Sequence, residues 1–152
     1  MKNILLIYGT QTGRTLRLAQ AAADGITEFS GDVHLTLKHG LEAGVDDLLQ
    51  CDGLLIGTPE NFGYMSGAVK DFLDRTYNAC RDRRIGLPYA LFISAGNDGS
   101  GAVRAIERIA TGYGWNPIAD ATIVVGEPLE ADLARVRELG QTLAAGLSCG
   151  VY

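Results

Sequence analysis

Apolar runs alternate with segments of helical periodicity along this chain. Continuous apolar runs, typical of strands buried on both faces, occupy residues 4–8, 53–58 and 89–93. Residues 33–38 alternate between apolar and polar side chains, which predicts an edge strand that is exposed on one face. Residues 118–125 supply the fifth predicted strand.

Between these strands, apolar residues recur at intervals of three and four, which predicts helices. We expect helices over 13–28 and 44–52, a third after residue 65, a fourth after residue 100 and a last one running to the C-terminus. Gly112 and Gly114 should stop the fourth helix, and Pro128 suits the first turn of the last. Strands that alternate with helices imply an α/β fold, with right-handed crossovers and a parallel sheet covered on both faces.

Composition and net charge exclude several classes of protein. The 152 residues suit a single domain spanning 1–152, and 47% hydrophobic with 20% charged residues is ordinary for a globular chain. The net charge of −5 disfavours a nucleic-acid partner, and no apolar run is long enough for a membrane span. The three cysteines form no CxxC pair, and no signal-peptide pattern opens the chain, so we expect a cytoplasmic location.

Three polar, glycine-rich loops follow the three apolar strands, starting after residues 8, 57 and 93. Because the strands are predicted to be parallel, all three loops should emerge at one edge of the sheet, where such folds bind ligands. The first loop leads into a helix, whose N-terminal amides and dipole attract anions. The hydroxyl groups of Thr10, Thr12 and Thr15 can also donate to a phosphate, and Gly13 lets a ligand approach the backbone. The alternative interpretation of this loop is a capped turn.

These loops resemble those of the flavodoxin-like FMN-binding family. The first, T-Q-T-G-R-T at 10–15, resembles the family's phosphate loop, T/S-x-T-G-x-T. The second, G-T-P-E-N-F-G-Y-M-S-G at 57–67, is similar to the loop of the flavodoxin-like NAD(P)H:quinone reductases, and S-A-G at 94–96 matches the start of their third loop. The resemblance implies a three-layer fold, a five-stranded parallel sheet in the order 2-1-3-4-5, and FMN as cofactor.

The resemblance also implies a role for each loop in binding FMN. The phosphate would be held by Thr10, Gln11, Thr12, Gly13, Arg14 and Thr15. The ring system would be lined by Thr58, Pro59, Glu60, Asn61, Phe62 and Gly63, with Phe62 or Tyr64 able to cover one face. The pyrimidine end and the other face would be contacted by Ser94, Ala95, Gly96, Asn97, Asp98 and Gly99. No side chain is assigned a catalytic or metal-binding role.

Three further features have a structural interpretation, and a fourth stays open. We expect Asp98 to be a turn residue, Trp115 to pack in the core, and the arginines at 75, 81, 83 and 84 to form a solvated helix end. Glu60 either touches the ring edge or faces water, and the sequence does not separate these two interpretations.

Three functions fit this sequence. The first is an FMN-binding protein that transfers electrons to redox partner proteins. The second is an NAD(P)H-dependent FMN or quinone oxidoreductase. The sequence of the second loop favours this enzyme, whereas the short chain favours the electron carrier. The third is a cofactor-free interaction module, because the third loop lacks the aromatic residue typical of electron-transfer flavodoxins. A response-regulator receiver is excluded, since Thr58 ends the third strand where an acceptor aspartate is needed.

Overall fold

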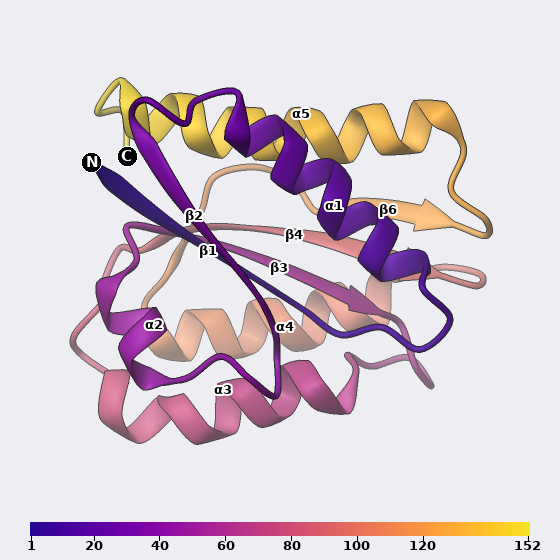
Figure 1. The fold of residues 1–152 in the computed structure, drawn as a ribbon. Coiled ribbons are helices and arrows are strands. Elements are labelled where there is room, and N and C mark those ends of the chain that lie inside the picture. The colour runs from indigo at the N-terminus through magenta and orange to yellow at the C-terminus, as the bar shows by residue number, and fades with distance from the viewer.

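A parallel sheet lies between two layers of helices in the computed structural model, which describes residues 1–152 (Figure 1). Its strands follow the order β2-β1-β3-β4-β5, and β6 also pairs with β4. This confirms the α/β class and the predicted order 2-1-3-4-5. The strands are β1 (Lys2–Tyr8), β2 (Val33–His39), β3 (Gly53–Pro59), β4 (Pro88–Ala95), β5 (Asn116–Pro117) and β6 (Thr122–Val125).

Two helices cover one face of the sheet and three cover the other (Figure 1). The first pair is α1 (Arg14–Thr27) and α5 (Glu130–Ser148). The opposite layer contains α2 (Val45–Gln50), α3 (Gly67–Cys80) and α4 (Ser100–Tyr113). The loops that leave the carboxyl ends of the strands therefore lie at one edge, away from the two chain termini. No helix is both long and apolar enough to cross a membrane.

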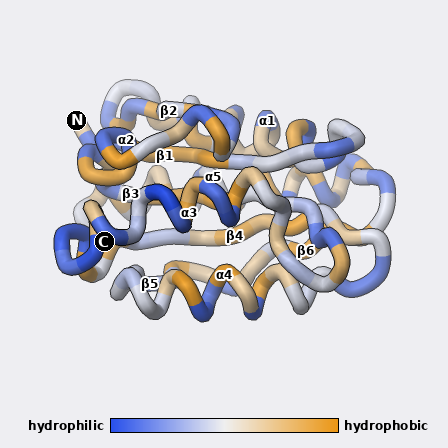
Figure 2. The backbone as a smooth tube through the Cα atoms, turned by 90° about the horizontal axis from the view of Figure 1, so that it is seen from below, coloured by the Kyte–Doolittle hydropathy of each residue, from blue (hydrophilic) through white to orange (hydrophobic).

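The alternation of side chains along β1 divides the core into two layers. Ile4 and Leu6 pack with α1 and α5, whereas Leu5 and Ile7 pack with α2, α3 and α4. The tube in Figure 2 is hydrophobic along β1, as expected for a strand covered on both sides. Trp115 is buried and stacks on Tyr113 with ring centroids 4.2 Å apart, which confirms its predicted place in the core.

The predicted fifth strand is interrupted. From Tyr89 to Phe92, β4 advances three positions, while its edge neighbour advances five, from Pro117 to Thr122. The two extra residues leave the ladder, so β5 and β6 are separate strands and the prediction of one strand over 118–125 is wrong at its start. Pro117 has no N–H group for the ladder, and an edge strand tolerates such a bulge because only one neighbour must be matched.

Two helix ends also differ from the prediction. Gly112 lies inside α4, and only Gly114, with φ of 78°, ends that helix. Pro128 precedes the N-cap of α5 instead of lying in its first turn. The cap is Leu129, whose N–H donates to the carboxylate of Asp132 at 2.9 Å, so an acidic side chain defines where this helix begins.

The four arginines around the end of α3 are not all solvated. Arg75 donates to the backbone carbonyls of Gly40, at 2.7 Å, and Ala43, at 3.0 Å. Arg84 donates to the carbonyl of Leu49. These two side chains therefore tie α3 and the loop after it to the segment around α2. The prediction of a solvated helix end is wrong for both, because these guanidinium groups donate to carbonyls before α2 and in its last turn.

Candidate functional site

The first loop presents unpaired donors at the start of α1. Thr10 Oγ1 accepts a hydrogen bond from the Gly13 N–H at 3.1 Å, which closes the turn, and Gly13 has φ of 91°. The N–H groups of Gln11, Thr12, Arg14 and Thr15 donate to no acceptor within the protein. A Cβ atom added at Gly13 would meet nothing within 4 Å, so the space above the loop is open. This arrangement suits an anion.

Thr15 adds a hydroxyl group to the same site. Only 1% of the residue is exposed, and its side chain makes no hydrogen bond within the protein. The Oγ1 atom is nevertheless not fully enclosed. Because this oxygen has no partner within the protein and is still accessible, it can form a hydrogen bond with a ligand. Thr15 is therefore a candidate ligand contact.

Positive charge borders the first loop. Arg14 and Arg17 both contact the carboxylate of Glu127, which lies just before α5, and the Arg14 contact is 3.1 Å. One carboxylate compensates one of the two guanidinium groups, so a net positive charge remains. A hollow of about 530 Å³ is lined here by Thr12, Gly13, Arg14, Arg17 and Glu127. Together with the α1 dipole, this charge favours a negatively charged ligand.

The second loop begins inside β3. Thr58 and Pro59 belong to that strand, and Thr58 is fully buried. Its Oγ1 donates to the Pro59 carbonyl at 2.8 Å and accepts from the Ser66 N–H at 2.9 Å. The Thr58 hydroxyl group therefore fastens the two ends of the loop to each other. Its hydrogen bonds are made inside the protein.

The tip of the second loop is a tight hairpin that exposes an aromatic ring. Asn61 and Tyr64 exchange two backbone hydrogen bonds, of 2.8 and 3.0 Å. Phe62 and Gly63 between them have φ of 52° and 72°, as in a type I′ turn. The left-handed conformation costs a non-glycine residue about 1–2 kcal/mol, and the Phe62 side chain is fully exposed. A strained backbone that presents a bare aromatic ring indicates a binding function.

Glu60 joins the second loop to the third. Its carboxylate accepts hydrogen bonds from the N–H groups of Gly99 at 3.0 Å, Gly101 at 2.9 Å and Ala102 at 3.2 Å. These amides lie at the start of α4, where the helix dipole favours a negative charge. The Glu60 N–H also donates to the Ser94 carbonyl at 2.9 Å. The carboxylate is therefore a helix cap contributed by a distant loop, a role that the sequence did not suggest.

The third loop is shorter than its sequence indicated. Ser94 and Ala95 are buried residues of β4, so the loop proper runs from Gly96 to Gly99. The Asp98 carboxylate accepts from the N–H of Ser100 at 3.2 Å and from its hydroxyl group. This confirms Asp98 as a turn residue before α4.

Close contacts at two glycines pack the first loop against the second loop, and the second loop against α4. A Cβ atom at Gly9 would lie 2.2 Å from Ser66 Oγ, and one at Gly101 would lie 2.2 Å from the Gly63 carbonyl oxygen. Only glycine allows the first loop to approach the second, and the second to approach α4, this closely. The predicted convergence of the loops at one sheet edge is thus present in the fold.

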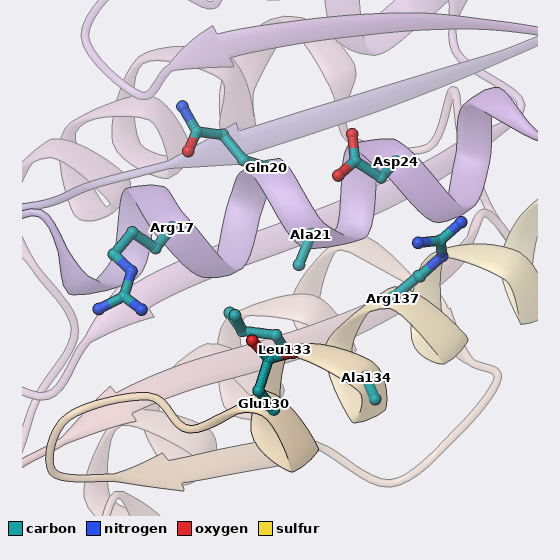
Figure 3. A pocket seen from close by; sticks show the side chains of 8 residues that line it. All are labelled: Arg17, Gln20, Ala21, Asp24, Glu130, Leu133, Ala134 and Arg137. Carbon is teal, nitrogen blue, oxygen red and sulfur yellow. The ribbon is translucent and has the colours of Figure 1, made fainter.

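One further groove lies outside these loops. It has a volume of about 420 Å³ and lies between α1 and α5 (Figure 3), where the apolar side chains of Ala21 and Leu133 face each other among charged residues of both helices. No group of three or more potential ligands is placed to hold a metal ion. The three cysteines are free.

Comparisons with known proteins place the chain among flavoproteins. The model of the family described as NADPH-dependent FMN reductase matches residues 2–127. A flavodoxin from Aquifex aeolicus is 32% identical, covering 95% of this chain and 86% of that protein. An NAD(P)H dehydrogenase (quinone) from Acidithiobacillus ferrooxidans is 30% identical, covering 84% and 72%.

Solved structures agree on the fold. A flavodoxin from the domain Archaea superposes with a TM-score of 0.84 at 21% identity, covering 95% of this chain and 98% of that one. A rubredoxin:oxygen oxidoreductase from Desulfovibrio gigas gives 0.85 at 17% identity, but this chain covers 37% of it. With the three loops and the 2-1-3-4-5 sheet, these matches show that the chain belongs to the flavodoxin-like NADPH-dependent FMN reductase family.

Proposed function

We propose that this chain binds FMN across its three loops and acts in electron transfer. The observation that carries the proposal is the start of α1, which offers four free amides and the unpartnered hydroxyl group of Thr15. The first-loop residues 10–15 would bind the phosphate group through these donors. When bound, FMN supplies the redox chemistry, and the protein binds it, orients it and excludes water.

The other two loops would hold the ring system. Asn61 to Gly63 and Gly96 to Asp98 are the predicted residues that remain accessible at the sheet edge, whereas Gly99 is buried and donates its N–H to Glu60. The exposed Phe62 ring would cover one face of the flavin. The side chains of Thr58, Glu60 and Asp98 are engaged within the protein. They would support the loops, and Pro59, Ser94 and Ala95 would contribute through the backbone at the ends of their strands.

A second candidate function is NAD(P)H-dependent reduction of FMN or a quinone. The family model and the similarity to an NAD(P)H dehydrogenase (quinone) favour it. Its partners would be NAD(P)H and a quinone-like acceptor, whereas an electron carrier would dock on redox proteins. Rapid bleaching of the protein-bound flavin by NADPH would favour the reductase, and an unchanged spectrum would favour the carrier.

A titration with FMN tests the proposal. The apoprotein should shift the visible absorbance of FMN and quench its fluorescence. Thr15→Val keeps the shape of the side chain but removes the hydroxyl group, and we expect it to weaken FMN binding by about tenfold. Thr27→Val is the matched control at the other end of α1, where the hydroxyl group donates to the Asp24 carbonyl, and it should bind FMN like the parent. A parent protein that takes up no FMN would overturn the proposal and leave the cofactor-free interaction module.

A further inference from the structure

The start of α1 carries positive charge where a helix ordinarily favours negative charge. Its first turn contains Arg14 and Arg17 and no acidic residue. The helix dipole adds a partial positive charge at this end, so the two guanidinium groups are unfavourable there without an anion nearby. Helical side chains tilt toward the N-terminus, and residues three apart share a face. Both guanidinium groups therefore lie beside the free amides of the first loop.

Glu127 supplies such an anion from a distant part of the chain. One oxygen of its carboxylate accepts a hydrogen bond from Arg14 Nε at 3.1 Å, and the other accepts from Arg17. Glu127 lies between β6 and α5, and the residue before it, Gly126, donates its N–H to the Ala95 carbonyl at 2.8 Å. This hydrogen bond ties the segment to the end of β4. The Glu127 carboxylate is thus held at the border of the first loop.

The three charged side chains share one hollow with the first loop. Its lining consists of Thr12 and Gly13 from the loop together with Arg14, Arg17 and Glu127, and Glu127 is the only acidic residue among them. A phosphate bound to the loop amides would therefore face the same two arginines that contact the carboxylate. Guanidinium donors directed at a carboxylate are not available to a phosphate. The carboxylate and a bound phosphate thus compete for these donors.

We infer that Glu127 restrains phosphate binding at the first loop by holding Arg14 and Arg17 on its own carboxylate. The loop then binds phosphate mainly through its amides and the Thr15 hydroxyl group, and less tightly than its positive charge allows. Glu127 is a positioning residue in this account, because it acts through the two arginines. The inference rests on the proposed function, since the phosphate would be that of FMN.

Glu127→Gln tests the inference, because it removes the charge and keeps the size of the side chain. In fluorescence titrations the variant apoprotein should bind FMN about threefold to tenfold more tightly than the parent protein, and both should bind riboflavin, which has no phosphate, with equal affinity. The urea midpoint of the apoprotein should fall, because the start of α1 loses its compensating charge. A side chain with only a structural role would lower the midpoint without raising the affinity for FMN.

Two further variants separate the cause of this effect. Glu138→Gln removes the same charge from an exposed residue of α5 that does not line the hollow, and it should leave FMN affinity unchanged. In a protein that already carries Arg14→Gln and Arg17→Gln, adding Glu127→Gln should not change FMN affinity, because the arginines that it would release are absent.

Three outcomes would overturn the inference. The first is FMN binding by Glu127→Gln that is no tighter than that of the parent protein. The second is equal tightening by Glu138→Gln, which would reduce the effect to net charge. The third is an undiminished effect of Glu127→Gln in the absence of both arginines, which would assign it to direct repulsion of the phosphate. A parent protein that takes up no FMN overturns the proposed function as well, whereas intact FMN binding with any of these three outcomes overturns only the role of Glu127.

Discussion

Removing the Glu60 carboxylate is the most informative perturbation of the loop arrangement. This side chain alone connects the second loop to three amides at the start of α4, at 3.0, 2.9 and 3.2 Å. In Glu60→Ala these amides lose their acceptor and α4 loses a negative charge at its N-terminus. In Glu60→Gln one amide oxygen remains to accept, but the charge is gone and an NH2 group faces the helix donors.

The expected magnitude follows from the number and kind of these hydrogen bonds. A hydrogen bond to a charged group contributes about 1.5–3 kcal/mol and a neutral one about 0.5–1.5 kcal/mol. Because Glu60 is partly exposed, water can reach the freed amides, so three bonds amount to much less than their sum. We therefore expect Glu60→Ala to lower the free energy of unfolding by about 2–3 kcal/mol and Glu60→Gln by about 1 kcal/mol.

Urea denaturation followed by circular dichroism measures this change directly. The same loss corresponds to a fall in Tm of about 4–12 °C for Glu60→Ala in a domain of this size. Glu42→Ala is the matched control, since Glu42 is exposed and its carboxylate makes no hydrogen bond or ion pair. FMN affinity should fall in the Glu60 variants and stay constant in the control. If Glu60→Ala unfolds within about 0.5 kcal/mol of the parent protein, the carboxylate does not hold the loops together.

Three further predictions address the tip of the second loop, the contact behind it and the core. Phe62→Asn should raise the free energy of unfolding by about 0.5–1 kcal/mol, because asparagine tolerates the φ of 52°, and should weaken FMN binding; a destabilised variant in urea denaturation would refute the strain. Gly101→Ala should destabilise the protein by about 1–3 kcal/mol in the same assay, because its Cβ atom meets the Gly63 carbonyl. Gly112→Ala is the control: it has open space in the same helix and should stabilise the protein by about 0.5–1 kcal/mol. If both variants change the stability in the same direction, the contact at Gly101 does not limit that position. Burial raises the pKa of the Tyr113 phenol from 10.0 to about 12. Between these values the folded state keeps a proton that the unfolded state loses. The contribution of Tyr113 to the free energy of unfolding should therefore be fully present below pH 10 and fall between about pH 10 and 12. Urea midpoints measured at several pH values should fall less steeply over this range in Tyr113→Phe, and identical slopes would contradict the burial argument.

Most of the fold could be predicted from local patterns. The strands β1, β3 and β4 are continuous apolar runs because they are covered on both faces, and β2 alternates because it is an edge strand. The interruption between β5 and β6 could not be predicted, since it depends on register against β4 and not on the apolar character of the residues themselves. Register is a property of two strands, and one segment does not reveal it.

The candidate site could also be predicted only in part from the sequence. The first loop could be recognised because its threonines and its glycine are adjacent in sequence and precede a helix. The role of Glu60 could not, because its partners are backbone amides 39 to 42 residues away, and a backbone amide leaves no signature in the sequence. Arg75 and Arg84 were missed for the same reason, since their acceptors are carbonyls of a distant segment. Side chains that bond to remote backbone are the part of a site that pattern reasoning does not reach.

A comparison of FMN with riboflavin tests the central claim most directly. The two molecules share the ring and the ribityl chain, and only FMN carries the phosphate that the first loop is proposed to bind. Fluorescence titration of the apoprotein should show FMN binding tighter than riboflavin by about 100-fold or more, because several charge-assisted hydrogen bonds and the α1 dipole act on the phosphate alone. Equal affinity for the two flavins would contradict the account, since the free amides and the Thr15 hydroxyl group would then have no part in binding.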